Sequence, residues 1–253
     1  DGSTYRCNDP ALSRHAFYDM MRAGKMPITA QVNVEEARAQ LEEQLKHGND
    51  LLCIMFSSAL SGTYNSVRVA AQELEAKYPE RRVVVIDSLS ASAGQGMLVA
   101  RAVDYREQGL PLEENAARIR EDIPHQAHLF TVDDLNHLRR GGRVSAATAL
   151  VGTMLGIKPV LALSDGAIHL VDKGRGRPGA LVAMYRQLDK QGGVDPAYGY
   201  TLLYSDDKQL TAPVHHYLHQ NLHLTGGRVG QIGPTIGTHI GPGAVGVAFV
   251  IPE

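Results

Sequence analysis

The chain has 253 residues, of which 43% are hydrophobic and 21% are charged, and its formal net charge at pH 7 is −2. This length allows one large domain or two modest ones, each with its own core. This net charge does not indicate the excess of basic residues that is typical of nucleic-acid-binding proteins, so we expect no nucleic-acid partner. No apolar run reaches the roughly 18 residues of a membrane span, and no signal peptide is visible, so we expect no transmembrane segment and a cytoplasmic location.

The first two-thirds of the chain alternate between helix and strand patterns. Apolar residues at helical spacing predict helices at 35–47, 62–78, 94–109 and 113–122. Apolar and β-branched runs predict strands at 51–56, 82–87 and 128–132. Strands without polar alternation, separated by helices, are typical of a parallel sheet that is covered on both faces.

The last third has a different pattern. Two strand-like runs flank a tight turn within 158–172, which predicts a hairpin. Further expected elements are helices at about 178–191 and 208–222 and strands at 199–205, 228–233 and 243–249. We therefore expect an α/β protein of two domains with a boundary near residues 145–160. Residues 1–150 would form a Rossmann-like parallel-sheet domain, and residues 151–253 an α/β domain with a mainly antiparallel sheet.

Two hydroxyl-rich turns follow neighbouring predicted strands, SSALSGTYNS at 57–66 and DSLSASAGQG at 87–96. A helix N-terminus presents unpaired N–H groups, and hydroxyls and glycine beside it suit an anion such as carboxylate or phosphate. Both turns lie at the carboxyl ends of strands, where open α/β sheets bind ligands. Asp87 argues against a polyphosphate. The alternative is that one serine caps each helix and the other hydroxyls are solvated.

Three later stretches add polar groups next to glycines. In LRRGGRVSAAT (138–148), Arg143 could pair with an anion or with Asp87, and Ser145 could cap a helix. The basic loop at 173–177 could meet a phosphate or an acidic partner. In PTIGTHIGPGAVGVAF (234–249), His239 stands among glycines that would let it approach a ligand. For each stretch the alternative is an exposed polar loop.

Several motifs of catalysis are missing from the sequence. It has no GxxxxGK[ST] phosphate loop, no GxSxG elbow and no HExxH pair. The histidines at 215, 216, 219 and 223 follow helical spacing and are interpreted as a solvated helix face. We therefore expect a binding protein without its own nucleotide site, with no metal and no cofactor, rather than an enzyme.

Taken in order, these stretches make the chain resemble the DegV family, from PITAQ (27–31) to GPGAVGVAF (241–249). The resemblance implies one long-chain fatty acid, of the palmitate, stearate or oleate class, in a tunnel between the two domains. It also implies a role as the acyl-binding subunit of a bacterial fatty acid kinase. A partner subunit would bring ATP and phosphorylate the carboxylate, and the acyl phosphate would enter phospholipid synthesis.

The resemblance also assigns residues. The family's carboxylate contacts fall on Thr29, Ser61 and Gly62, and its glycine-flanked histidine near the head group matches His239. Its kinase-related arginines match Arg143 and Arg175, although the 173–177 loop offers two arginines.

The chain departs from the family pattern in two places. The family's T-S-Q-P-S reads T-A-Q-V-N here, so Ala30 removes one hydroxyl. The family's opening strand is not in this sequence, so we expect the first domain to lack it. Two other functions stay open: a lipid transporter or sensor without a kinase partner, and a stand-alone phosphotransferase or hydrolase that uses Ser61 or His239.

Overall fold

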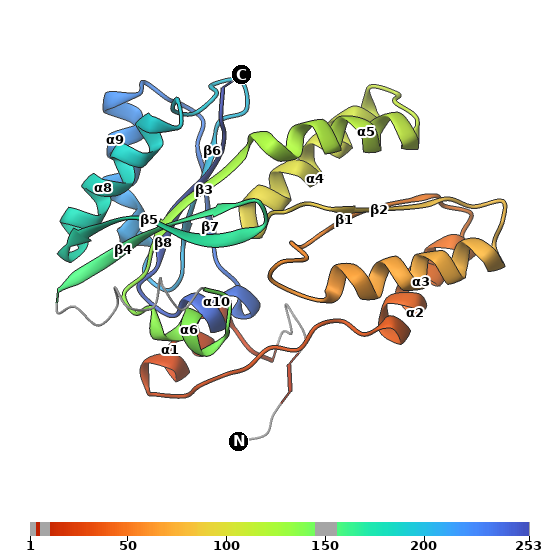
Figure 1. The fold of residues 1–253 in the computed structure, drawn as a ribbon, viewed down its shortest axis with the longest axis horizontal. Helices are drawn as coiled ribbons and strands as arrows, with labels where there is room; N and C mark the ends of the chain where they lie inside the picture. The colour runs from red at the N-terminus through yellow and green to blue at the C-terminus, as the bar shows by residue number, and fades with distance from the viewer. Residues whose placement is uncertain (1–3, 6–10, 145–155, 253) are drawn as a thin grey trace. The chain divides into compact units, whose positions relative to one another are not determined.

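A computed structural model describes residues 4–5, 11–144 and 156–252 (Figure 1). The chain divides into two compact units. Unit 1 comprises residues 1–29, 127–164 and 168–253, and unit 2 comprises residues 30–126 and 165–167. The division differs from the expected boundary near 145–160, because the chain enters unit 2 at residue 30 and returns to unit 1 at residue 127. Ser145, expected to cap a helix, lies outside the described residues.

Unit 2 is a small parallel sheet between two pairs of helices. Its elements are α2 (Val34–Lys46), β1 (Leu51–Met55), α3 (Thr63–Lys77), β2 (Val83–Asp87), α4 (Ser92–Glu107), α5 (Leu112–Asp122) and the short 3-10 helix η1 (Ile123–His125). Strands β1 and β2 pair in parallel, with Leu51 opposite Val83. Figure 1 shows α2 and α3 on one side of this sheet and α4 and α5 on the other. The helices and strands expected between residues 35 and 122 are thus present.

The two faces of this small sheet bury alternate residues of each strand. Ile54 and Ile86 pack with Leu98 of α4 and Ile119 of α5 in one cluster. Val83 packs on the opposite side with the buried side chains of α2 and α3. Because successive side chains of a strand point to opposite faces, a continuous apolar run is what burial on both faces requires.

Unit 1 is built on a six-stranded mixed sheet with the strand order β5-β4-β3-β8-β6-β7. The strands are β3 (Gln126–Thr131), β4 (Ile157–Ser164), β5 (Ala167–Arg175), β6 (Tyr200–Tyr204), β7 (Arg228–Gln231) and β8 (Val245–Val250). Its helices among the described residues are α1 (Arg14–Arg22), α6 (Asn136–Arg140), α8 (Gly176–Lys190), η3 (Lys208–Thr211), α9 (Ala212–Asn221) and α10 (Pro234–Ile240). Strand β3 is antiparallel to β4, β6 is antiparallel to β8, and β6 is parallel to β7.

The expectation that the strand at 128–132 belongs to the parallel sheet was wrong. Strand β3 pairs with β4 in the larger sheet, with Leu129 opposite Ala162. The apolar run HLFTV indicates burial on both faces, and a central strand of a mixed sheet meets that requirement as well as a parallel strand does. Direction and partner cannot be read from such a run.

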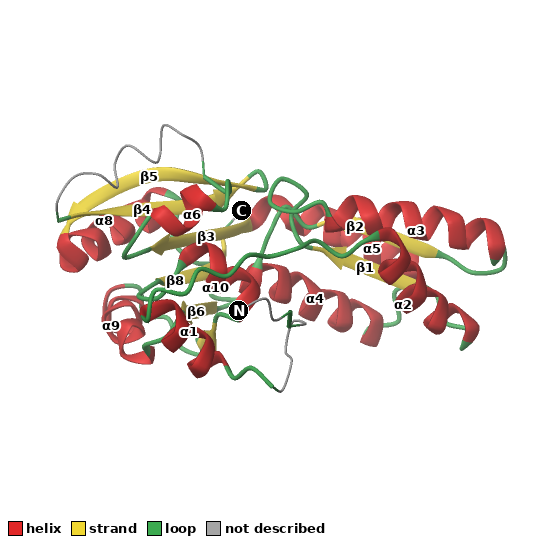
Figure 2. Ribbon diagram, turned by 90° about the horizontal axis from the view of Figure 1, so that it is seen from below, coloured by secondary structure: helices red, strands yellow, loops and turns green. Residues whose placement is uncertain are grey.

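Helices cover both faces of the larger sheet (Figure 2). Leu129, Leu202 and Phe249 are fully buried in the cluster that contains α8 and α9. Leu161 lies in a second cluster with Leu138 of α6 and Ile240 of α10. Figure 1 shows α1, α6 and α10 gathered at one end of this unit. These three short helices, which the sequence analysis did not anticipate, carry or adjoin the site described below.

Helix α1 is anchored to α10 by aromatic contacts. The buried hydroxyl of Tyr18 donates a hydrogen bond of 3.0 Å to the carbonyl oxygen of Ile232. A side chain at Gly237 would come within 3.0 Å of Phe17 and Tyr18, so only glycine allows this approach. Among the described residues, the helices are all too short or too polar to cross a bilayer.

Candidate functional site

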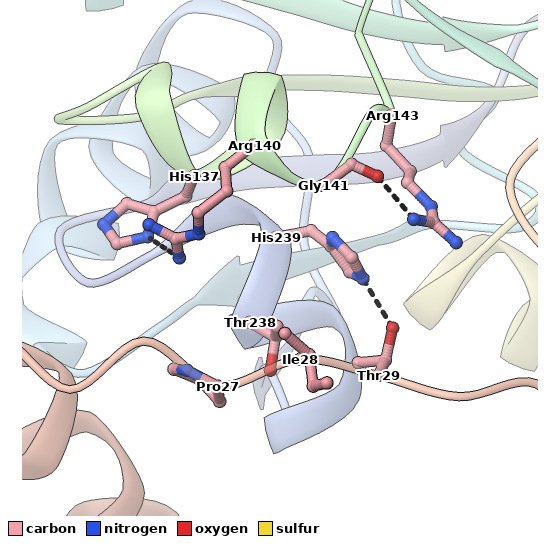
Figure 3. A pocket seen from close by; sticks show the side chains of 9 residues that line it. All are labelled: Pro27, Ile28, Thr29, His137, Arg140, Gly141, Arg143, Thr238 and His239. Carbon is pink, nitrogen blue, oxygen red and sulfur yellow. Dashed lines mark hydrogen bonds between the residues drawn. The ribbon is translucent and has the colours of Figure 1, made fainter.

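Unit 1 contains a pocket of about 220 Å³ (Figure 3). It lies between the extended segment that follows α1, the turn after α6 and the last turn of α10. Its lining consists of Pro27, Ile28, Thr29, His137, Arg140, Gly141, Arg143, Thr238 and His239. Pockets for small-molecule ligands usually enclose about 300–1,000 Å³. The size therefore fits a polar head group better than a whole acyl chain.

Thr29 and His239 meet in this pocket. The Thr29 Oγ1 and the His239 Nε2 lie 2.8 Å apart, which is a hydrogen bond between residues 210 positions apart in the sequence. Burial lowers the pKa of His239 below its ordinary value of 6.5, and the nearby Arg143 and Arg140 lower it further. The imidazole is therefore neutral at pH 7, and the two side chains form an uncharged pair.

Two glycines allow the histidines of the pocket to pack tightly. A Cβ at Gly141 would lie closer than 3.0 Å to the Nδ1 of His239. A Cβ at Gly241, whose φ is +74°, would lie equally close to the ring of His137. The histidine of α6 thus covers the glycine that ends α10, and the histidine of α10 covers the glycine that ends α6. No larger residue fits at either glycine without moving a ring.

Two arginines form a positive rim on the pocket. Arg143 donates to the carbonyl oxygen of Gly141. The Arg140 Nη2 lies 3.3 Å from the His137 Nδ1. Because a guanidinium can only donate, the Nδ1 of His137 accepts and this imidazole is neutral. In agreement, burial lowers the pKa of His137; Asp134 opposes this shift, and Arg140 adds a smaller lowering.

The first hydroxyl-rich turn lies in unit 2 and opens α3. Gly62 stands at the N-cap position of this helix, where no side chain caps the helix. The Ser61 Oγ accepts the N–H of Thr63 at 3.2 Å and lies 3.0 Å from the Thr63 Oγ1. The Thr63 Oγ1 in turn accepts the N–H of Val32 at 3.2 Å. The side chain of Gln31 packs against Gly62 so closely that a Cβ there would not fit.

Two other polar residues of these turns, Ser57 and Asp87, have structural roles. The buried Ser57 hydroxyl donates to the carbonyl oxygen of Gly166 at 2.6 Å. The Asp87 carboxylate accepts the N–H groups of Ser58 and Leu89, each at 3.1 Å. These bonds fix both turns from within. Turn formation therefore accounts for part of the hydroxyl excess. The alternative of one capping serine per helix with solvated hydroxyls is not what the described part of the chain has, because neither α3 nor α4 has a side-chain cap and Ser57, Ser88 and Ser90 are buried.

The two arginines of the basic loop have different surroundings. The Arg177 Nη2 contacts the Asp133 Oδ1 at 2.7 Å and the Gly243 carbonyl oxygen at 2.8 Å. Lys158 reaches the same carboxylate at 3.0 Å. Arg175 is exposed at the end of β5, and its side chain makes no hydrogen bond or ion pair within the described ranges. Arg177 therefore holds the glycine loop after α10, while the head group of Arg175 is accessible.

The predicted site residues divide between the two units. Thr29, His239 and Arg143 line the pocket of unit 1, whereas Ser61 and Gly62 belong to unit 2. Arg175 is in unit 1 but does not line this pocket. Their roles in binding stay predictions.

The sequence analysis did not identify several residues that line the pocket or contact the turn at Ser61 and Gly62. These are Gln31, Thr63, His137, Arg140, Gly141 and Thr238. The RRGGR motif indicated a turn after α6, but nothing in the sequence indicated that this turn packs against α10. In the part of the chain that the structure describes, no group of three or more His, Cys, Asp or Glu side chains could hold a metal ion.

Comparison with known proteins places the whole chain in one class. A family model described as "Uncharacterised protein, DegV family" matches residues 1–252. A DegV domain-containing protein of Clostridium perfringens is 35% identical over 252 residues, which cover 99% of this chain and 87% of that protein.

Two solved structures share the fold. A structure described as "Fatty Acid Binding of a DegV family Protein from Thermus thermophilus" matches with 30% identity and a TM-score of 0.85, over 98% of this chain and 88% of that one. A fatty acid binding DegV protein from Bacillus subtilis matches with 28% identity and a TM-score of 0.82, over 99% and 88%. The protein belongs to the DegV family.

Proposed function

We propose that this protein binds one long-chain fatty acid and presents its carboxylate to a partner kinase, which converts it to an acyl phosphate. The observation that carries the proposal is the hydrogen bond between Thr29 and a neutral His239 in a head-group-sized pocket. The similarity to DegV proteins described as fatty acid binding supports the same ligand class. In this proposal the chain itself is a binding subunit and not an enzyme.

The chemistry of the pocket suits a carboxylate that must later react. A buried carboxylate without partners is costly, so its oxygens need hydrogen-bond donors. Hydroxyls at Thr29 and Ser61 and the N–H of Gly62 would supply neutral donors. A direct salt bridge with an arginine would hold the carboxylate more firmly but make its oxygen a weaker nucleophile towards a phosphoryl group.

The acyl chain would supply most of the affinity. Burying about 14 methylenes at roughly 0.8 kcal/mol each gives on the order of 10 kcal/mol before the costs of binding. Ile28, which lines the pocket, and Met26, two residues before it, are 91% and 67% exposed, although Ile and Met are among the residues most often buried. We propose that the acyl chain lies in a tunnel, as the resemblance implied.

Arg143 and Arg175 are proposed to serve the kinase step. Arg143 lines the pocket, and the guanidinium of Arg175 is accessible at the surface of unit 1. A planar guanidinium can donate hydrogen bonds to two oxygens of one phosphate at once. This property suits a site where ATP and a carboxylate meet. Arg177 is assigned a structural role instead, because Asp133 and Gly243 already engage it.

Native mass spectrometry of the protein purified from bacteria tests the ligand. We expect a mass increment that organic extraction removes and that corresponds to one fatty acid of the palmitate, stearate or oleate class. Addition of palmitate to delipidated protein should restore a one-to-one complex. A clean apo mass that does not shift with added fatty acid would contradict the proposal.

A phosphorylation assay with an ATP-binding fatty acid kinase subunit tests the second step. Arg143→Ala and Arg175→Ala should each reduce acyl phosphate formation at least tenfold while palmitate still binds. Arg228→Ala, an exposed arginine on β7, is the matched control and should behave like the parent protein. If all three variants support the rate of the parent protein, Arg143 and Arg175 do not serve the kinase step. If the parent protein itself yields no acyl phosphate although palmitate binds, the chain is better described as a lipid carrier without a kinase. ATP turnover by the isolated chain would instead favour a stand-alone enzyme.

A further inference from the structure

The hydrogen bond between Thr29 and His239 has a direction that decides what Thr29 offers to a ligand. If the hydroxyl donates to the Nε2 of His239, only its lone pairs face outward, and these repel a carboxylate. If the Nε2–H of His239 donates to the hydroxyl oxygen, the hydroxyl hydrogen is left to donate to a ligand. The 2.8 Å distance between the Thr29 Oγ1 and the Nε2 is compatible with both directions.

The other ring nitrogen of His239, the Nδ1, distinguishes the two possible directions of this hydrogen bond. This Nδ1 is buried and has no hydrogen-bond partner among the described residues. A neutral imidazole carries one proton, on the Nδ1 or on the Nε2. Buried N–H groups without an acceptor are rarer in proteins than buried lone pairs without a donor. A bare Nδ1 is therefore the less costly arrangement.

Gly141 adds a steric reason. The position that a Cβ would take at Gly141 lies within 3.0 Å of the His239 Nδ1, so the hydrogen that glycine carries there points at this nitrogen. The Cα–H of Gly141 is a weak donor that suits a lone pair on the Nδ1. A hydrogen on the Nδ1 would instead collide with the hydrogen of Gly141. The turn after α6 thus leaves room for a lone pair on the Nδ1 but not for a proton.

We infer that His239 is held as the Nε2–H tautomer and acts as a positioning residue, whose N–H occupies the acceptor side of the Thr29 hydroxyl and directs its hydrogen to the ligand. This inference rests on the proposed function for its biological meaning, since the ligand that needs a donor is the fatty-acid carboxylate. It changes the expected role of His239: the imidazole acts through Thr29 and need not touch the head group.

The tautomer can be read directly in the delipidated wild-type protein. Long-range ¹H–¹⁵N correlation spectra distinguish a protonated ring nitrogen from a bare one, and the His239 signals are assigned by their loss in His239→Gln. At pH 7.5 we expect a protonated Nε2 and a bare Nδ1. A protonated Nδ1 overturns the inference. This result does not depend on whether a fatty acid binds, so it separates failure of the inference from failure of the proposed function.

Two amide substitutions test the consequence for binding. Glutamine can place an N–H close to the position of the Nε2, whereas asparagine places its amide near the Nδ1. By titration with palmitate, we expect His239→Gln to weaken binding threefold to tenfold and His239→Asn to weaken it at least tenfold more. Circular dichroism should give the same helix content for both variants and the parent. Equal binding by the two variants, or tighter binding by His239→Asn, overturns the inference.

Discussion

Thr29 and Ser61 are assigned the same task, but the structure holds their hydroxyls in contrasting ways. The hydroxyl of Ser61 in unit 2 is fixed by Thr63, only two residues later in the chain. That of Thr29 in unit 1 is fixed by His239, which is 210 residues away. The first arrangement needs only a turn at a helix start. The second depends on α6, α10 and two glycines packing correctly, so distant substitutions should disturb it more.

Gly141→Ala should produce the largest effect. The added methyl group would overlap the His239 ring, and relief of such overpacking costs about 1–3 kcal/mol of stability. We also expect at least tenfold weaker binding of palmitate, because the ring must move away from Thr29. Chemical denaturation and palmitate titration measure the two effects.

Gly233→Ala is the matched control for that experiment. Gly233 has a φ of −78°, and a Cβ there would meet nothing within 4 Å. This variant should therefore bind and unfold like the parent protein. Equal behaviour of the two alanine variants would show that the contact between Gly141 and His239 has no energetic weight.

Thr63→Val tests the local arrangement of unit 2. The change removes the oxygen that accepts the Val32 N–H and pairs with the Ser61 hydroxyl. Loss of such a hydrogen bond typically costs about 1 kcal/mol. We expect that loss of stability and a severalfold weaker affinity for palmitate, while Thr63→Ser should recover most of both. If valine binds palmitate as well as serine does, the hydroxyl of Thr63 does not position Ser61.

Acidification should weaken unit 1 through two half-buried histidines, His137 and His239. The folded-state pKa values of His137 and His239 lie below the ordinary 6.5, chiefly because burial disfavours the charged rings. Neighbouring arginines add to the shift at both residues, and Asp134 opposes it at His137. Below pH 6.5 the unfolded chain therefore binds more protons than the folded one, and stability falls as pH decreases. Denaturation midpoints measured at pH 7.5, 6.5 and 5.5 should decline. The double variant His137→Gln/His239→Gln should decline less steeply; an unchanged slope would assign the effect to other groups.

Ala30→Ser should have the smallest effect. Ala30 is exposed, and exposed substitutions of this kind usually change stability by less than about 0.5 kcal/mol. The added hydroxyl restores the family's T-S-Q order and would provide one more donor next to Thr29. We expect palmitate to bind more tightly, but by less than tenfold, in a direct titration. A weaker complex would mean that the residue at position 30 does not face the head group.

The sequence predicted regular elements better than it predicted their partners. Apolar periodicity located helices such as α2 and α3 and strands such as β1 and β6, because burial imposes a period on any amphipathic element. It assigned β3 to the wrong sheet, since an apolar run carries no information about which strand lies beside it. It missed α1, α6 and α10, of which α6 and α10 contain only 5 and 7 residues and so show little periodicity.

The same limit applies to the site. The turn at Ser61 and Gly62 could be identified from consecutive residues, because hydroxyls and a glycine at a helix start are a local signal. The placement of Thr29 beside His239 was reached only through family resemblance. The pairing of Gly141 with His239 leaves no local trace, since each residue is ordinary within its own segment. The sequence does not distinguish Arg177 from Arg175, because the contact of Arg177 with Asp133 joins residues 44 positions apart.

The crossed contacts between α6 and α10, in which His239 covers Gly141 and His137 covers Gly241, have a consequence for recombination. Each glycine is required by a histidine that lies about 100 residues away in the chain. A chimera that joins residues 136–142 of one relative to residues 234–243 of another keeps the site only if both segments carry the matching glycine and histidine. These two stretches should therefore be inherited together. Crossovers that join mismatched versions of them should be selected against.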